Sequence, residues 1–184
     1  IIGLANGDFT CSNCTVSVSG SGSSYTLTVT PTSSGAFSVL LPASMVADSA
    51  GNSNTASNTL NWSYDNSAPT VSLSTSSNPT NTSPISVSVI FSEAVSGLTS
   101  GDFVVSNGTV GSLTGGATVY TLSVTPTGAG VVTVDLGTNS AQDGAGNGNI
   151  AATQLNVTYD NVDPTIILAV GGGGAASGSI TNST

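Results

Sequence analysis

The stretch Tyr120-Thr-Leu-Ser-Val-Thr-Pro-Thr127 places an apolar residue at every second position and then reaches a proline. This alternation predicts a β-strand with one buried face, and the proline marks the end of that strand. Almost the same residues, Tyr25-Thr-Leu-Thr-Val-Thr-Pro-Thr32, stand 95 positions earlier. The same strand pattern used twice indicates an all-β chain built from a tandem repeat.

Other stretches recur with the same shift. DSAGNSN at 48–54 returns as DGAGNGN at 143–149, and YDNSAPT at 64–70 returns as YDNVDPT at 159–165. Upstream, GLANGDF and GLTSGDF are 94 positions apart, so one residue has been gained or lost in the hairpin region. We therefore predict the C-terminal part of one repeat at 1–69, a complete repeat at 70–164, and the N-terminal strands of a third repeat at 165–184.

The complete copy predicts a two-sheet β-sandwich. It has six or seven short alternating segments, separated by turns rich in Gly, Pro, Asn and Ser, and it contains no amphipathic helix. The expected inward positions are Val71 and Leu73; Ile85, Val87, Val89 and Phe91; Phe103 and Val105; Tyr120, Leu122 and Val124; Val132, Val134 and Leu136; and Leu155, Val157 and Tyr159. A core of this size predicts modules of modest stability.

The two ends of the chain fall at nearly the same point of the repeat, since Ile1 corresponds to Val95 and Thr184 to Val89. We expect a two-repeat window of a longer array, in which a segment such as 165–184 supplies the strands that the next copy's first domain lacks. The alternative is a short subunit whose C-terminal strand adds to its neighbour in a donated-strand fibre.

The charge balance excludes several functions. The chain has no Lys, Arg or His, carries nine acidic residues, and has a net charge of −9 and a pI of about 4.1. Nucleic-acid binding lacks its electrostatic attraction, and anionic membranes repel the chain. Without a His or Lys base or an Arg clamp we expect no enzyme, no catalytic residues and no required cofactor. The chain also lacks an apolar run long enough to cross a bilayer, so we expect no membrane insertion in this segment.

The stretches FSEAVSGLTSGDFVVSNGTV, YTLSVTPTGAGVVTVDL, DGAGNGN and LNVTYDNVDPT together resemble the bacterial immunoglobulin-like repeat of large secreted surface adhesins. This resemblance covers essentially the whole chain. It implies an extracellular, cell-surface rod of tandem Ig-like β-sandwich modules of about 95 residues. Such a rod holds a binding tip away from the cell or forms the shaft of a filament.

The acidic residues recur at equivalent positions, with Asp48 matching Asp143 and Asp65 matching Asp160. Calcium is the candidate ligand, because it accepts carboxylate, amide and backbone oxygens. The resemblance adds that calcium stiffens module junctions in some related arrays, and we expect Asp160 and the DGAGNGN loop near such a junction. The alternative is that Asp and Asn cap turns by bonding their own backbone. The candidate ligands are Asp48, Asn52, Asp65, Glu93, Asp102, Asp143, Asn147 and Asp160.

Cys11 and Cys14 form a CSNC motif where the second copy has Val105-Ser-Asn-Gly108, which reads as a hairpin turn. The first and fourth Cα atoms of a β-turn lie within about 7 Å, which a disulfide spans. A redox motif or half of a metal site are the alternatives, but the chain offers no second pair and no His. We expect a local disulfide in an exported chain.

The chain also lacks the Lys residues that keep strand edges from pairing. We therefore expect association of neighbouring repeats or copies end to end, and lateral association into filaments. A carbohydrate-binding module is the alternative from another class, and it requires a patch of exposed aromatic side chains. Only 5% of residues are aromatic, and nearly all stand at inward positions.

Overall fold

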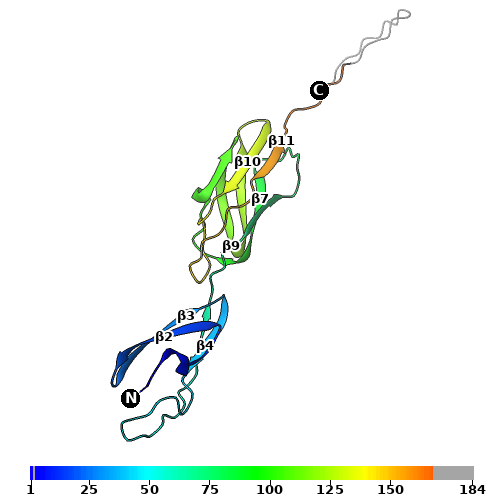
Figure 1. The fold of residues 1–184 in the computed structure, drawn as a ribbon. Coiled ribbons are helices and arrows are strands. Elements are labelled where there is room, and N and C mark those ends of the chain that lie inside the picture. The colour runs from blue at the N-terminus through cyan, green and yellow to red at the C-terminus, as the bar shows by residue number, and fades with distance from the viewer. Residues whose placement is uncertain (2, 168–184) are drawn as a thin grey trace, which may run out of the picture.

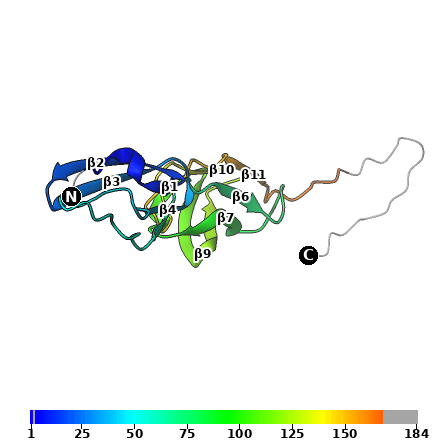
Figure 2. The ribbon, with the colours of Figure 1, turned by 60° about the horizontal axis from the view of Figure 1, so that its bottom comes forward.

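Figure 1 shows a computed structural model of the chain, which describes residue 1 and residues 3–167. Two β-rich modules lie end to end, joined by residues 65–69, and the turned view of Figure 2 shows the same arrangement. No helix in the described part of the chain is long and apolar enough to cross a membrane. The predicted strands of a third repeat at 165–184 lie outside the described residues from 168 onward.

The second module is the predicted two-sheet sandwich. Its strands are β6 (Val71–Thr75), β7 (Ile85–Val95), β8 (Phe103–Ser106), β9 (Gly108–Pro126), β10 (Gly130–Leu136) and β11 (Leu155–Tyr159), with the short 3-10 helix η2 (Ser100–Asp102) before β8. One sheet has the order β6-β7-β9 and the other β8-β10-β11, and all pairs within the sheets are antiparallel. The all-β prediction is confirmed.

The alternating residues of the two sheets face each other and form the core of this module. Val87, Val89, Leu122, Val124, Val132, Val134 and Val157 are fully buried. At one end of the core, the rings of Phe91 and Tyr120 meet edge to face with centroids 6.0 Å apart. The Tyr120 hydroxyl donates a hydrogen bond to the backbone carbonyl of Val95 at 3.2 Å, so the ring is buried with its polar atom satisfied.

One strand was not predicted. β9 continues upstream to Gly108 and doubles back on itself around Gly115, whose φ is +104°. An added Cβ at Gly115 would collide with the backbone carbonyl of Val119, so only glycine fits this bend. The upstream half is rich in Gly, Ser and Thr and lacks the alternation that identifies a strand.

The first module repeats this plan without its first two strands. It comprises the 3-10 helix η1 (Asn6–Asp8) and strands β1 (Thr10–Ser12), β2 (Cys14–Ser21), β3 (Ser24–Pro31), β4 (Gly35–Leu40) and β5 (Leu60–Tyr64). The sheets are β1-β4-β5 and β2-β3. β2 and β3 are the equivalent of the doubled β9, whereas nothing in the described residues of this module corresponds to β6 and most of β7. Val39 and Val46 are its buried large hydrophobic residues.

The two modules share their unusual backbone conformations as well as their strands. Positive φ angles pair at Asn13 (54°) with Asn107 (50°), at Gly20 (114°) with Gly115 (104°), at Gly35 with Gly130, at Ser44 with Asn139, and at Gly51 with Gly146. The shift between equivalents changes from 94 to 95 between the first two of these pairs, within β2 and β9. The inserted residue thus lies in the hairpin, as the sequence indicated.

Candidate functional site

The loop that follows β10 is held together by the carboxylate of Asp143. One oxygen accepts hydrogen bonds from the backbone N–H groups of Ala145 and Asn147, both at 2.8 Å, and the other accepts from the Nδ2 of Asn147 at 2.8 Å. The Asn147 side chain is the largest cause that lowers the pKa of Asp143 below its ordinary value, since these bonds favour the charged form. Asp143 therefore caps its own turn.

The first module builds the same loop around Asp48. Its carboxylate accepts from the backbone of Ala50 at 2.9 Å and of Asn52 at 2.8 Å, and from the Asn52 side chain at 2.9 Å. The pKa of Asp48 is lowered for the same reason, again with the Asn52 side chain first. Turn capping, one of the two interpretations of the D-x-A-G-N motif, thus describes both copies.

An asparagine anchors each loop to its module, and in the second module this asparagine is buried. In the second module, Asn149 accepts from the backbone N–H of Ala141 at 2.8 Å and donates to the carbonyls of Gly137 and Ile150 at 2.9 and 2.7 Å. Asn54 makes the corresponding bonds in the first module. The last Asn of DSAGNSN and DGAGNGN was the sequence signal for this anchor, although no role was predicted for it.

This loop of the second module meets the linker that enters from the first module. The Nδ2 of Asn147 donates to the backbone carbonyl of Asp65 at 3.2 Å, and the N–H of Ile150 donates to the carbonyl of Pro69 at 3.0 Å. The linker ends on Thr70, whose N–H donates to the Ser92 hydroxyl at 3.0 Å. Pro69 itself is fully buried. The junction is therefore a packed contact and not a free tether.

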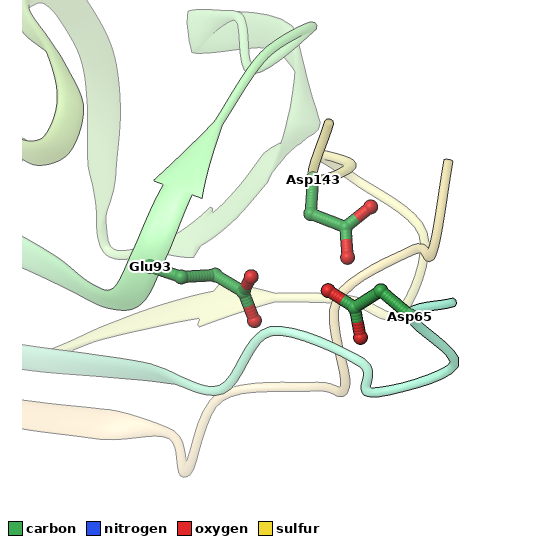
Figure 3. Close-up of side chains that lie close together, drawn as sticks. All are labelled: Asp65, Glu93 and Asp143. Atoms are coloured by element: carbon green, nitrogen blue, oxygen red, sulfur yellow. The ribbon is translucent and has the colours of Figure 1, made fainter. Parts of the chain in front are cut away.

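Three carboxylates converge at this junction. Asp65 comes from the linker, Glu93 from β7 and Asp143 from the loop, and each offers an oxygen within 4.8 Å of the others (Figure 3). Asp143 is buried, with 5% of its surface exposed, whereas Asp65 is exposed. Two like charges at this separation repel by about 1 to 3 kcal/mol, depending on how much water screens them. Because the chain has no Lys, Arg or His, no side chain of its own can neutralise the cluster.

The donor chemistry of this acidic cluster, meaning Asp65, Glu93 and Asp143, fits a hard divalent cation such as calcium. Three carboxylates supply up to six oxygens from three separate segments of chain. One side of the cluster is already fixed by the hydrogen bonds of Asp143. The set contains no sulfur or imidazole, which the softer transition metals prefer.

The other predicted calcium ligands lie elsewhere. Asn147 adjoins the cluster, while Asp48 and Asn52 form the first-module loop. Asp102 caps η2 by accepting from the N–H and hydroxyl of Thr99 at 2.7 and 2.8 Å. Asp160 lies at the opposite end of its module, where its N–H donates to the carbonyl of Thr80. The sequence predicted Asp160 at the same junction as the DGAGNGN loop, and the structure corrects this. The carboxylate beside the loop is Asp65 of the preceding repeat, because the loop lies at the start of its module.

The acidic cluster joins residues of both modules. One ligand comes from the end of the upstream module and two come from the downstream module. In the sequence repeat, Asp160 is the equivalent of Asp65, and Asp48 is the equivalent of Asp143. Asp48 is exposed, whereas Asp143 is buried at the loop that the linker contacts; among the described residues no linker contacts the first-module loop.

A second feature is an aromatic groove on the first module. The rings of Phe37 and Trp62 stack with centroids 5.4 Å apart and planes 21° from parallel. Together with Leu27, Val29 and Tyr64 they line a groove of about 400 Å³ between β3 and β5. Trp62 is 46% exposed and Tyr64 is 37% exposed, although both stand at inward positions of the repeat. Sequence reasoning placed these residues in the core and missed the groove.

The structure joins Cys11 and Cys14 in a disulfide, with Cα atoms 5.6 Å apart. Asn13 takes the left-handed conformation inside this turn, as Asn107 does in the second module. There, a Cβ on Gly108 would lie 3.2 Å from a methyl group of Val105. The valine of the second copy and the disulfide of the first therefore fill the same space.

Comparison with known proteins supports the repeat. A sequence model described as a bacterial Ig-like domain matches residues 1–64 and again residues 65–159. Each matched range ends at the last strand of a module, and the second range starts at the linker, five residues before the boundary predicted at 69/70. No curated protein and no solved structure matches the chain.

Proposed function

The chain belongs to the bacterial Ig-like domain family, and from that premise we propose that it is a segment of the stalk of an extracellular bacterial adhesin or surface filament. Domains of this family are typical of surface and extracellular proteins, and the domain type is non-catalytic. The stalk presents a binding tip or forms a fibre. Its mechanism is extension, spacing and the bearing of load.

The packed junction is the observation that carries this proposal. Its linker is only five residues long, includes the buried Pro69, and is hydrogen-bonded to the second module through Ile150 and Asn147. A short linker held in this way resists bending, whereas a long polar linker behaves as a flexible coil. Stacked modules with such joints form a rod. The low charge and the absence of Lys at strand edges support lateral association of such rods as well.

Localisation on cells tests the stalk. An antibody against residues 70–159 should label intact, unpermeabilised producing cells, at a distance from the envelope in electron micrographs. Deletion of the gene should remove these projections or weaken attachment of the cells to surfaces. Labelling that requires permeabilised cells, or a deletion strain with unchanged projections and unchanged attachment, would contradict the proposal.

The aromatic groove favours a second candidate, a carbohydrate-binding module, because stacked exposed rings are suited to sugar faces. The second module argues against it. There the positions of Phe37, Trp62 and Tyr64 are taken by Val132, Val157 and Tyr159, which are buried core residues. Titration of surface oligosaccharides against Trp62 fluorescence tests this candidate, and saturable quenching that Phe37→Ala abolishes would support it.

We also propose that calcium binds the acidic cluster and stiffens the junction. The support is the convergence of three carboxylates from two modules in a chain without cationic side chains. A divalent ion replaces the mutual repulsion of Asp65, Glu93 and Asp143 by attraction to one centre. It thereby ties the linker to both the loop and β7.

Calorimetric titration of calcium into the chelator-treated chain tests this role. We expect one site per junction with an affinity in the range of about 10⁻⁴ to 10⁻³ M, which is usual for extracellular modules. Glu93→Gln should weaken binding at least about tenfold, since it removes one of three charged ligands. Asp163→Asn is the matched control, because it removes the same charge from an exposed position outside the cluster. No heat at about 10 mM calcium, or equal loss in both variants, would contradict the proposal.

A further inference from the structure

The first and last strands of the second module belong to different sheets. Among the strands that the structure describes, β6 pairs with β7 alone and β11 pairs with β10 alone. The two sheets meet through the apolar side chains of the core. Tension between the two ends of the module would therefore have to cross that core, unless the end segments are joined directly.

A direct connection of this kind follows β6. Thr80 lies beside the outer edge of β11 and forms a parallel bridge with Tyr159. Its N–H donates to the carbonyl of Thr158 at 2.9 Å, and its carbonyl accepts from the N–H of Asp160 at 2.9 Å. This is the hydrogen-bond pattern of a parallel β-ladder.

The side chain of Asn78 extends this ladder by one step. Its Nδ2 donates to the carbonyl of Asn156 at 2.8 Å, and its Oδ1 accepts from the N–H of Thr158 at 2.9 Å. The amide thus replaces a backbone peptide group next to Pro79, which has no N–H to donate. Together with the two hydrogen bonds of Thr80, these two join residues 78–80, the 78–80 segment, to β11.

The chain enters and leaves the second module at opposite ends. The linker contacts Ile150 at the end that faces the first module, and the chain leaves beyond β11 at the far end (Figure 1). Because the 78–80 segment and β11 run parallel, tension pulls the segment back towards the linker and pulls β11 forwards. The two would have to slide past each other along their own axes. This motion loads all the hydrogen bonds between them at once, and not one after another.

The place of this contact in the chain determines how much of the module it protects. It joins the segment after the first strand to the end of the last strand. While it holds, β7 to β10 lie in a closed loop between Thr80 and Asp160, and tension bypasses them. Only residues 70–79 can be drawn out, at most about 35 Å of chain, whereas opening of the loop releases about 280 Å.

We propose that the hydrogen bonds between the 78–80 segment and β11 form the mechanical clamp of the second module, the contact that sets the force at which the module unfolds. This inference rests on the proposed load-bearing stalk and assigns its load to specific bonds. At equilibrium these exposed bonds contribute little, because water competes for the same groups. Under tension they decide the unfolding rate, because they must break together before the loop can open.

Single-molecule stretching of the chain from its two ends tests the clamp. Asn78→Ala removes two of the bonds to β11 and should make the second module unfold at least about fivefold faster at the same force. The unfolding event of this module is recognised by the release of about 280 Å of chain.

Asn107→Gly is the matched control. It also removes two amide hydrogen bonds, one to Gly128 and one to Thr127, but these lie inside the closed loop. Glycine also tolerates the positive φ of 50° at this position. The unfolding rate of this variant under force should stay within about twofold of that of the native chain.

Equilibrium measurements separate a clamp from a general loss of stability. Both substitutions should lower the unfolding free energy of the second module to a similar extent, since each removes two amide hydrogen bonds. Hydrogen exchange of the native chain adds a check that needs no variant. The amides of Thr80, Thr158 and Asp160 should exchange at least about a hundredfold more slowly than in an unfolded chain.

Equal acceleration by both substitutions under force, or no acceleration by Asn78→Ala, would overturn the clamp. Rapid exchange of the Thr80 and Asp160 amides would overturn it as well, because the segment would then not be held against β11. These measurements use the isolated chain, so none of their outcomes bears on the surface-labelling test of the stalk. Failure of surface labelling would overturn the stalk whatever the stretching shows.

Discussion

Truncating one leucine in each module should reveal how far each core is complete. Leu122 in β9 and Leu27 in β3 are equivalent residues, and from the preceding tyrosine to the following proline their strands differ only at Ser123 and Thr28. Leu122 is fully buried between two sheets, whereas Leu27 lies on the wall of the aromatic groove and keeps contact with solvent. The substitutions Leu122→Ala and Leu27→Ala therefore remove the same atoms from a closed and an open environment.

The structure gives the size of the difference. Removing a fully buried leucine side chain leaves a cavity and costs about 2 to 5 kcal/mol. At about 3 kcal/mol, the melting temperature of a module of this size falls by about 12 to 24 °C. Leu27 loses less buried area and leaves no closed cavity, so we expect a cost of about 1 kcal/mol in dilute solution.

Each module can be followed separately. The single tryptophan, Trp62, lies in β5 and reports unfolding of the first module by its fluorescence. Hydrogen exchange of the β9 amides reports the second module. Both unfolding free energies should be measured in dilute solution.

The comparison between the two variants decides the outcome. In dilute solution, Leu27→Ala should lower the unfolding free energy of its module by less than Leu122→Ala lowers that of the second module. Equal costs for the two variants in dilute solution would refute this account, since they would mean that the first module closes its core alone.

Three further outcomes follow from the site and the junction. Cys11→Val with Cys14→Gly replaces the disulfide by the residues of the second copy. It should lower the free energy of unfolding in urea by about 2 kcal/mol or less, because the bond closes so short a loop. A much larger decrease would mean that the disulfide stabilises more than its own turn. The lowered pKa of Asp143 in the folded state means that its contribution to stability is complete above the ordinary value of 3.8 and is lost as pH falls through the lowered pKa; melting of the second module should thus be flat from about pH 7 to 5 and decline below about pH 4, and a decline already at neutral pH would contradict this. Pro69→Gly should widen the spread of module orientations in small-angle X-ray scattering while leaving the hydrogen exchange of β9 unchanged, and an unaltered scattering profile would show that the linker does not stiffen the joint.

Much of the fold is readable from local pattern. Alternation identifies β7, the downstream half of β9, β10 and β11 because one face of each strand is buried, and Gly, Asn and Pro mark the turns between them. The upstream half of β9 was not predicted, because a strand made of Gly, Ser and Thr shows little alternation of apolar and polar residues. Its pairing depends on backbone geometry around Gly115 instead of on side-chain chemistry.

Only part of the candidate site could be predicted from the sequence. Eight oxygen-bearing residues were predicted as calcium ligands, and the structure brings Asp65, Glu93 and Asp143 together. No local sequence signal selects these three residues, because they lie far apart in the chain. Asp65 belongs to the linker, Glu93 to β7, and Asp143 to a loop about fifty residues after β7. Asp160 was expected with this loop near a module junction, but its N–H bonds Thr80 at the opposite end of the module.

The amino-acid sequence by itself determined the all-β class, the period of the repeat and the placing of most strands and turns, because these depend on neighbours within a few residues. It also determined that no side chain of this chain can carry a positive charge, since it contains no Lys, Arg or His. Tertiary structure alone decided which carboxylates meet at the junction and which inward positions remain open. Both depend on contacts between distant segments, and the same inward-facing residue is buried or exposed according to whether a strand from elsewhere covers it.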